Sequence, residues 1–193
     1  AKSIVENNLY GLDIDERAAQ LAYFAVMMKA RQYDRRLFNH GVQPHVYAIR
    51  GSNHLNPFCV DYFVNGDAKL KADMQTLIEE LHDAKEYGSI LNVTNVDFDA
   101  MYARFDEIRS DINIMREAAL NELLPFVQVA HIIAQKYDIV ITNPPYLNAS
   151  YMPDKLKKFV QSNYADFKSD LFAAFACRIL QMCKTNGHVG LLM

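Results

Sequence analysis

The amino-terminal part of the chain combines short apolar runs with one long amphipathic segment. Residues 9–13 (Leu-Tyr-Gly-Leu-Asp) predict a short strand, and Asp15 then precedes a stretch whose apolar residues recur at helical spacing. Asp15 is placed to cap this helix, which we expect to continue towards the stop signals Gly41 and Pro44. Residues 45–50 (His-Val-Tyr-Ala-Ile-Arg) predict a second strand, so the first unit is strand, helix, strand.

The middle of the chain has a different pattern. From about residue 56 to residue 135 the sequence consists of charged segments with helical spacing, and the clearest of them cover residues 68–86 and 98–124. We interpret this region as a helical insertion rather than a second domain.

The carboxyl-terminal part returns to alternating strands and helices. Residues 137–142 (Tyr-Asp-Ile-Val-Ile-Thr) predict a third strand, and helices are expected near residues 154–164 and 169–184. Residues 188–193 predict a fourth strand. Strands without polar alternation that are separated by helices indicate an α/β fold with a mostly parallel sheet.

Composition narrows the class of protein. The 193 residues are 51% hydrophobic and carry a formal charge of −3, which is typical of a globular domain and argues against a whole-surface grip on nucleic acid. The three cysteines are not spaced as metal ligands, and no signal peptide or membrane span is evident. We therefore expect a cytoplasmic protein with reduced thiols and no membrane association.

The candidate chemistry lies directly after the third predicted strand, in the tetrapeptide Asn143-Pro144-Pro145-Tyr146. The edge formed by the carboxyl ends of parallel strands is where α/β proteins bind ligands. The carboxamide of Asn143 and the carbonyl of Pro144 are suited to accept both hydrogens of a planar exocyclic amine, and Pro145 stiffens the backbone. Tyr146 supplies a ring on which a base can stack. The alternative is a simple turn, because all four residue types are common in turns.

A second candidate site follows the first predicted strand. Because Asp15 fills the capping position, Asp13 is left at the strand tip without a structural task, and its carboxylate is placed to bind two ribose hydroxyls. Ile14 is then placed to pack against an adenine. The alternative for Asp13 is an ordinary helix cap. The six histidines show no metal spacing, so no metal site is expected, and the lysines after the tetrapeptide are better explained as a solvated helix face than as phosphate contacts; they are Lys155, Lys157, Lys158 and Lys168.

With these motifs the chain resembles S-adenosylmethionine-dependent adenine-specific DNA methyltransferases, and within them the PglX group of bacterial BREX phage-defence systems. The resemblance rests on residues 10–15 and 138–146, and on the similar segments 15–22 and 83–89. It implies a Rossmann-like class I methyltransferase fold with S-adenosylmethionine as cofactor. The implied reaction is methylation of the N6 amine of an adenine flipped out of double-stranded DNA, in phage defence or restriction-modification. Other phage-defence proteins are the further partners that it implies.

The resemblance also assigns roles to individual residues. Asp13 would bind the cofactor ribose, Asn143 and the Pro144 carbonyl would hold the target amine, and Tyr146 would stack on the flipped adenine. The group has another, acidic cofactor contact near the position of Ser52, where no acidic residue is obvious.

Two features of the group are not found in the sequence. Its glycine-rich cofactor loop would lie just before Ile4, and its target-recognition domain would follow the last strand. We therefore expect residues 1–193 to be part of a catalytic domain from a larger enzyme, inactive by itself. Methylation of RNA adenine or of protein glutamine remains an alternative, as does a noncatalytic interaction module.

Overall fold

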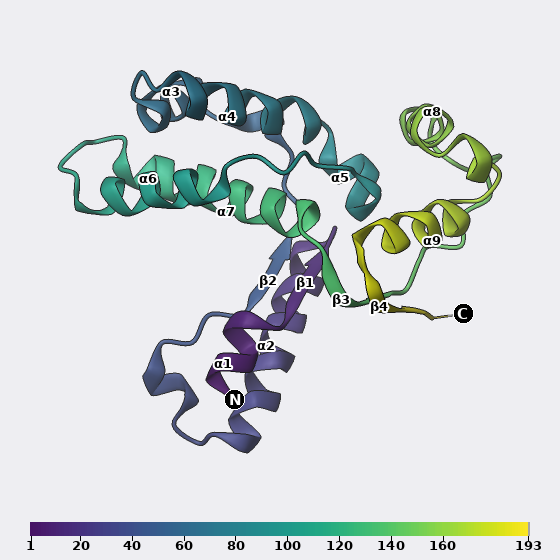
Figure 1. Cartoon of the computed structure of the whole chain (residues 1–193), viewed down its shortest axis with the longest axis horizontal. Coiled ribbons are helices and arrows are strands. Elements are labelled where there is room, and N and C mark those ends of the chain that lie inside the picture. The colour runs from purple at the N-terminus through teal and green to yellow at the C-terminus, as the bar shows by residue number, and fades with distance from the viewer. Residues whose placement is uncertain (193) are drawn as a thin grey trace.

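The computed structural model describes residues 1–192, which form helices around two small parallel sheets (Figure 1). The four strands are β1 (Tyr10–Asp13), β2 (His45–Ala48), β3 (Tyr137–Thr142) and β4 (Cys183–Leu191). The α-helices are α1 (Lys2–Asn7), α2 (Glu16–Tyr33), α3 (Pro57–Val64), α4 (Ala68–Glu80), α5 (Ala84–Tyr87), α6 (Phe98–Ser110), α7 (Arg116–Ala134), α8 (Asp154–Asn163) and α9 (Leu171–Met182). Short 3₁₀ helices are η1 (Leu37–His40), η2 (Ser52–His54), η3 (Gly88–Ile90) and η4 (Ala165–Phe167). No helix within residues 1–192 is long and apolar enough to cross a membrane.

The strands pair in parallel, as the sequence predicted, but they form two sheets rather than one. β1 pairs with β2 in the register Tyr10–His45 to Asp13–Ala48, and β3 pairs with β4. Within residues 1–192 no hydrogen-bond ladder joins β1 to β3. The α/β class with parallel strands is therefore confirmed, whereas the strands of residues 1–192 do not form a single sheet.

The two sheets lie edge to edge. The ring of Tyr10 at the start of β1 makes an edge contact with the ring of Tyr137 at the start of β3, with 5.3 Å between the ring centroids. A cavity of about 140 Å³ lies between the strands and is lined along both of them, from Tyr10 to Leu12 and from Tyr137 to Thr142. Because their last residues also line a common cavity, β1 and β3 run in the same direction on either side of this groove.

The helix after β1 begins where the sequence predicted and ends earlier. The Asp15 carboxylate accepts hydrogen bonds from the backbone N–H groups of Arg17 and Ala18, at 2.7 and 3.1 Å, so Asp15 is the N-cap of α2. The helix ends at Tyr33, well before Gly41. The Asp34 carboxylate accepts the N–H of Arg36 at 3.0 Å, and this local turn competes with helical hydrogen bonds.

The predicted helical insertion of about residues 56–135 is divided into more helices than the sequence predicted. The segment 68–86 is interrupted between α4 and α5, where Asp83 adopts the left-handed region at φ 57°. The segment 98–124 is interrupted between α6 and α7, where Asp111 and Asn113 accept hydrogen bonds from nearby backbone N–H groups. Helix α3 lies inside the region predicted to be helical, although its own bounds were not predicted. Apolar periodicity runs through these breaks, so it did not reveal the turns.

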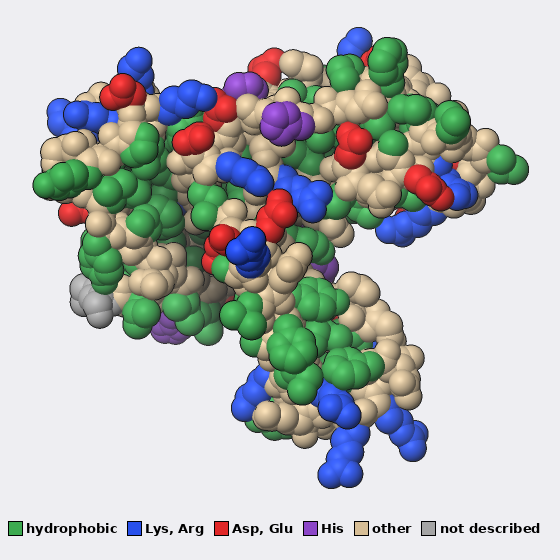
Figure 2. All heavy atoms as spheres, turned by 180° about the vertical axis from the view of Figure 1, so that it is seen from behind, with side chains coloured by type: hydrophobic (Ala, Val, Ile, Leu, Met, Phe, Trp, Pro, Cys, Tyr) green, Lys and Arg blue, Asp and Glu red, His purple; other side chains and the backbone are tan. Residues whose placement is uncertain are grey.

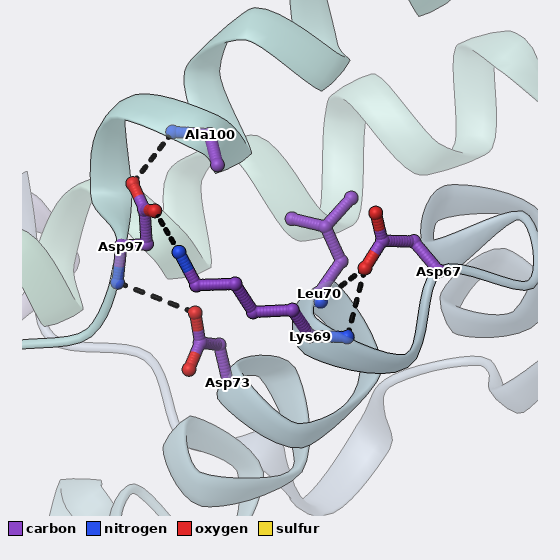
Figure 3. Close-up of polar contacts among 6 residues, drawn as sticks. All are labelled: Asp67, Lys69, Leu70, Asp73, Asp97 and Ala100. Carbon is purple, nitrogen blue, oxygen red and sulfur yellow. Dashed lines mark hydrogen bonds and ion pairs between the residues drawn. The ribbon is translucent and has the colours of Figure 1, made fainter.

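Two helices of the insertion are joined at their amino-terminal ends (Figure 3). The Asp67 carboxylate caps α4 through the N–H of Lys69 at 2.8 Å, and Asp97 caps α6 through the N–H of Ala100 at 3.0 Å. The Lys69 ammonium forms an ion pair with Asp97, and Asp73 accepts the N–H of Asp97 at 3.3 Å. Each helix start therefore contacts the other, which fixes α4 against α6.

The largest core lies among the helices of residues 56–135, and side chains of β1 and β2 pack against its edge. Helices α3, α4, α6 and α7 bury apolar side chains together, with the rings of Phe63 and Phe105 4.6 Å apart. Ile49, directly after β2, belongs to this core and connects the insertion to the first sheet. A second core lies between α8, α9 and η3 around Val160, and a third between α1 and α2 around Leu37.

The last strand starts earlier than predicted. β4 begins at Cys183, whereas the sequence suggested His188, because a register irregularity between Tyr137 and Ile139 lets the pairing extend past Gly187. Met193, the last residue of the predicted strand, lies outside the described residues.

Candidate functional site

A cavity of about 570 Å³ lies at the carboxyl ends of β1 and β3. Its lining includes Asp13 and Ile14 after β1 and the tetrapeptide 143–146 after β3. The structure therefore brings together all six site residues that the sequence predicted, from segments that lie more than a hundred positions apart in the chain. This is the edge at which parallel sheets bind ligands.

Asp13 has a structural task that the sequence analysis missed. One of its carboxylate oxygens, Oδ1, accepts the backbone N–H of Asp15 at 2.9 Å, which orders the turn between β1 and α2. The prediction that Asp13 has no structural role is therefore wrong, since a capping residue two positions later does not exclude a second turn bond. The other oxygen, Oδ2, has no hydrogen-bond partner within residues 1–192 and remains able to bind a hydroxyl pair.

Ile14 presents an apolar surface beside this carboxylate. Its side chain is 48% exposed. A Cβ atom built on Gly88 would lie 3.6 Å from Ile14 Cδ1, which places the turn after α5 in contact range of Ile14. An exposed isoleucine at the mouth of a cavity is suited to pack against a flat ring.

The tetrapeptide is anchored at one residue and open at the others. Pro144 is buried, whereas Asn143, Pro145 and Tyr146 are exposed. The ring of Tyr146 stacks on Phe172 of α9 at 5.9 Å between centroids, and its hydroxyl donates to the carbonyl of Leu192 at 3.2 Å. The ring is thus held in place while most of its surface stays available, because Tyr146 is 68% exposed.

A third wall of the cavity was not predicted as part of the site. It is the turn of residues 86–89, in which Gly88 is buried and the hydroxyl of Ser89 has no hydrogen-bond partner within residues 1–192. Apolar side chains from α8 and α9 complete the lining; they are Leu156, Leu171 and Phe175. The resemblance at residues 83–89 was the one sequence signal that pointed to this turn.

The turn after β2 is fixed to the insertion. Ser52 is buried, its hydroxyl donates to the Ile78 carbonyl at 2.6 Å, and its N–H donates to the Leu81 carbonyl at 3.1 Å. A Cβ on Gly51 would lie 3.3 Å from the Leu81 carbonyl oxygen, so this close approach favours glycine. Ser52 therefore has a structural explanation, and it does not line the site cavity.

The lysines after the tetrapeptide are divided between two environments. Lys155 forms an ion pair with Asp83 at 2.9 Å. Lys157, Lys158 and Lys168 form no ion pair within residues 1–192; Lys157 is half-buried, and the other two are exposed. No group of three or more His, Cys, Asp or Glu side chains in this described part of the chain is arranged to hold a metal ion.

Comparisons with a family model and with curated proteins both point to methyltransferases. The model of the Eco57I restriction-modification methylase family matches residues 7–193. The chain is 36% identical to "Adenine-specific methyltransferase BrxX" of Escherichia coli O9:H4 (strain HS), over 95% of this chain and 17% of that protein. It is 35% identical to "Adenine-specific methyltransferase PglX" of Lacticaseibacillus casei (strain Zhang), over 97% of this chain and 16% of that protein. The chain therefore spans about a sixth of the length of these curated relatives.

Proposed function

From the premise that this chain belongs to the Eco57I restriction-modification methylase family, we propose that it is part of the catalytic domain of an adenine-specific DNA methyltransferase. The observation that carries the proposal is the cavity at the ends of β1 and β3, which is lined both by Asp13 and Ile14 and by the whole tetrapeptide. The residues at the end of β1 would bind one ligand of the reaction, and the residues after β3 would bind the other. Both relatives are named adenine-specific methyltransferases, which favours adenine over glutamine as the methylated group.

On the β3 side, the residues would activate a poorly nucleophilic amine. The lone pair of an adenine N6 is delocalised into the ring. If Asn143 Oδ1 and the Pro144 carbonyl each accept one N6 hydrogen, the pyramidal form with an available lone pair is favoured. N6 would then form the bond to the methyl group as the sulfur–methyl bond of the sulfonium donor breaks and leaves a neutral thioether, and one of the two N6 hydrogens would leave as a proton to water.

The same residues would also recognise the base. An amine inside a duplex cannot reach a cavity of this kind, so the adenine must be flipped out of double-stranded DNA. The exposed face of Tyr146 is available for stacking on the flipped base, and Pro145 keeps the backbone rigid between the ring and the acceptors. Positioning and hydrogen bonding then supply the catalysis.

On the β1 side, the residues fit the nucleoside end of S-adenosylmethionine. The free oxygen of Asp13 is suited to the ribose hydroxyls, and the exposed surface of Ile14 is suited to the adenine ring. This cofactor supplies a methyl group on a sulfonium, so no covalent intermediate with the protein is needed.

The groove between β1 and β3 supports a finer proposal about the fold. We propose that a further parallel strand, from polypeptide outside residues 1–193, fills it and joins the two sheets into a Rossmann-like class I methyltransferase fold. Two apolar residues of β3, Ile139 and Ile141, are 61% and 76% exposed, which is unusual for a strand of a parallel sheet. On α2, Leu21 and Phe24 are 68% and 60% exposed, and Figure 2 shows hydrophobic side chains gathered on the lobe of α1 and α2. A strand followed by a helix would cover these surfaces.

In this proposal residues 1–193 are a partial catalytic domain, and the helical region of about residues 56–135 is an insertion within it. The glycine-rich cofactor loop and the target-recognition domain would be supplied by the same further polypeptide. Membership of a restriction-modification family supports a role in restriction-modification or phage defence. Other defence proteins would be the partners in such a role.

The test is methyl transfer from labelled S-adenosylmethionine to DNA by the full-length protein. We expect Asn143→Ala to lower kcat by roughly a hundredfold or more, because a transition-state hydrogen bond is lost. Tyr146→Ala should weaken binding of the flipped adenine by about 1 to 3 kcal/mol, because stacking on the ring is lost. Tyr151→Ala is a matched control, since Tyr151 is 79% exposed and does not line the cavity.

Full activity of Asn143→Ala would contradict the assignment. Mass analysis of nucleosides from cells with and without the gene then separates the substrates. A methylation change confined to RNA or to protein would replace DNA as the substrate, and absence of S-adenosylmethionine binding by the full-length protein would favour a noncatalytic module.

A further inference from the structure

Asp83 joins three segments that are distant in the sequence. Its backbone N–H donates to Asn53 Oδ1 at 3.0 Å, and Asn53 Nδ2 donates back to Asp83 Oδ1 at 2.7 Å. Its other oxygen, Oδ2, accepts from the Lys155 ammonium at 2.9 Å. Asn53 belongs to η2 after β2, Asp83 immediately precedes α5, and Lys155 is in α8.

Each joined segment lines a cavity at this edge of the sheets. Asn53 and Asp83 line a polar cavity of about 520 Å³, and Leu156, the neighbour of Lys155, lines the site cavity. Glu86 lines both. The three residues therefore lie behind the walls of the candidate site, and none of them lines the space in which the reacting atoms would meet.

The network is more specific than a surface ion pair. The Asp83 side chain is 19% exposed, and its φ of 57° is a left-handed conformation that aspartate tolerates better than most residues. Hydrogen bonds from Lys155 and from Asn53 lower the pKa of the Asp83 carboxyl below its ordinary value, so the carboxylate is charged near neutral pH. His82 Nδ1 lies 3.5 Å from the same carboxylate. A carboxylate with two hydrogen-bond donors from distant segments, Asn53 on one oxygen and Lys155 on the other, is suited to hold those segments in register.

We propose that Asp83 is a positioning residue, which, through Asn53 and Lys155, holds the turn of residues 86–89 and helix α8 at a fixed separation. The turn lines the cavity together with Ile14 on the cofactor side, and α8 follows the tetrapeptide on the base side. Asp83 thus aligns the two reactants without touching either. The inference rests on the proposed function, since it concerns the same cavity.

Misalignment has a distinct kinetic signature. A small displacement of reacting groups lowers the rate of the chemical step and leaves the binding of each ligand nearly unchanged. If Lys155 instead contacted DNA phosphates, its removal would weaken DNA binding and reduce the salt dependence of that binding. If the network served stability alone, its loss would lower the melting temperature without changing the single-turnover rate.

The experiment is a double-mutant cycle in the full-length protein, with single-turnover methyl transfer measured at saturating DNA and S-adenosylmethionine. The variants are Asp83→Asn, which keeps a residue tolerant of the left-handed region, Lys155→Met, which keeps most of the side-chain length, and the double variant. We expect each single variant to be slower by about tenfold or more, and the double variant to be no slower than the worse single one. Lys155→Arg should restore most of the rate, and Lys158→Met, an exposed lysine on the same helix, should match wild type.

Unchanged single-turnover rates, multiplicative effects in the double variant, or a loss confined to DNA affinity would each overturn the inference. Asn143→Ala is measured in parallel. If it abolishes transfer while the Asp83 and Lys155 variants remain fast, the positioning role fails and the proposed function stands. If the wild-type protein transfers no methyl group, both fail.

Discussion

Replacement of Gly88 by alanine tests the geometry of the unpredicted wall of the site. Gly88 joins α5 to η3 at φ 63° and ψ −148°, a region that residues with a side chain rarely occupy. A Cβ built there would meet only Ile14 Cδ1, at 3.6 Å, which is an ordinary contact distance. The cost of the substitution therefore comes from the backbone and not from crowding.

The expected magnitude follows from this distinction. Holding a residue with a side chain in such a region costs on the order of 1 to 3 kcal/mol. A loss of about 2 kcal/mol corresponds to a roughly thirtyfold shift of the folding equilibrium. We expect Gly88→Ala to lower the free energy of unfolding by about that amount.

The assay is urea unfolding of the protein, with Gly41 as the comparison position. Gly41 lies at φ 60° and ψ 30° with nothing within 4 Å of its would-be Cβ, so Gly41→Ala should cost about 1 to 2 kcal/mol. Gly41→Asn should cost less, because asparagine tolerates this left-handed region, whereas Gly88→Asn gains no such relief at ψ −148°. The reasoning is refuted if Gly88→Asn is as stable as wild type, or if Gly88→Ala is less costly than Gly41→Ala.

Three further predictions concern the rest of the chain. Burial lowers the pKa of His131 below its ordinary value of 6.5, so that on acidification the unfolded chain binds a proton at this histidine before the folded chain does. The stability that the neutral histidine contributes is therefore full above pH 6.5 and is lost as the pH falls through 6.5 towards the folded-state pKa. His131→Phe should therefore reduce the loss of melting temperature between pH 7 and about pH 5, and an unchanged pH dependence would contradict this. Phe105→Ala should lower the free energy of unfolding in urea by about 3 to 5 kcal/mol, since Phe105 is 1% exposed. Phe58 is 73% exposed, so Phe58→Ala should lower it by less than about 0.5 kcal/mol. Equal losses would contradict the assigned core. Residues 1–193 alone should transfer no methyl group to DNA, because a cavity rather than a strand lies between β1 and β3. Micromolar binding of S-adenosylmethionine, together with turnover on DNA, would show this prediction to be wrong.

The elements that were predicted well are those with strong local signals. The apolar, branched run of residues 137–142 matches β3, and Asp15 caps α2 through its own neighbours in the chain. The breaks at Asp83 and Asp111 were missed, because a left-handed residue or a local side-chain turn can interrupt a helix without changing the apolar spacing around it.

The candidate site was predictable to the same extent. The position of the tetrapeptide after a strand, and of Asp13 after another, follows from the sequence, and parallel strands end at one edge of a sheet. The Asp13–Asp15 turn bond was missed, although it is local, because a capping residue does not reveal whether a second side chain also accepts a hydrogen bond in the same turn.

The sequence by itself thus determined which residues carry the candidate chemistry and on which elements they lie, since caps, apolar runs and turn residues act over a few positions. The tertiary structure decided how these residues are held. Asp83 finds Asn53 thirty positions away and Lys155 seventy-two positions away, and no local pattern specifies such partners. The separation of the strands into two sheets was decided at the same level, because the ladder of a parallel strand depends on which distant segment lies beside it.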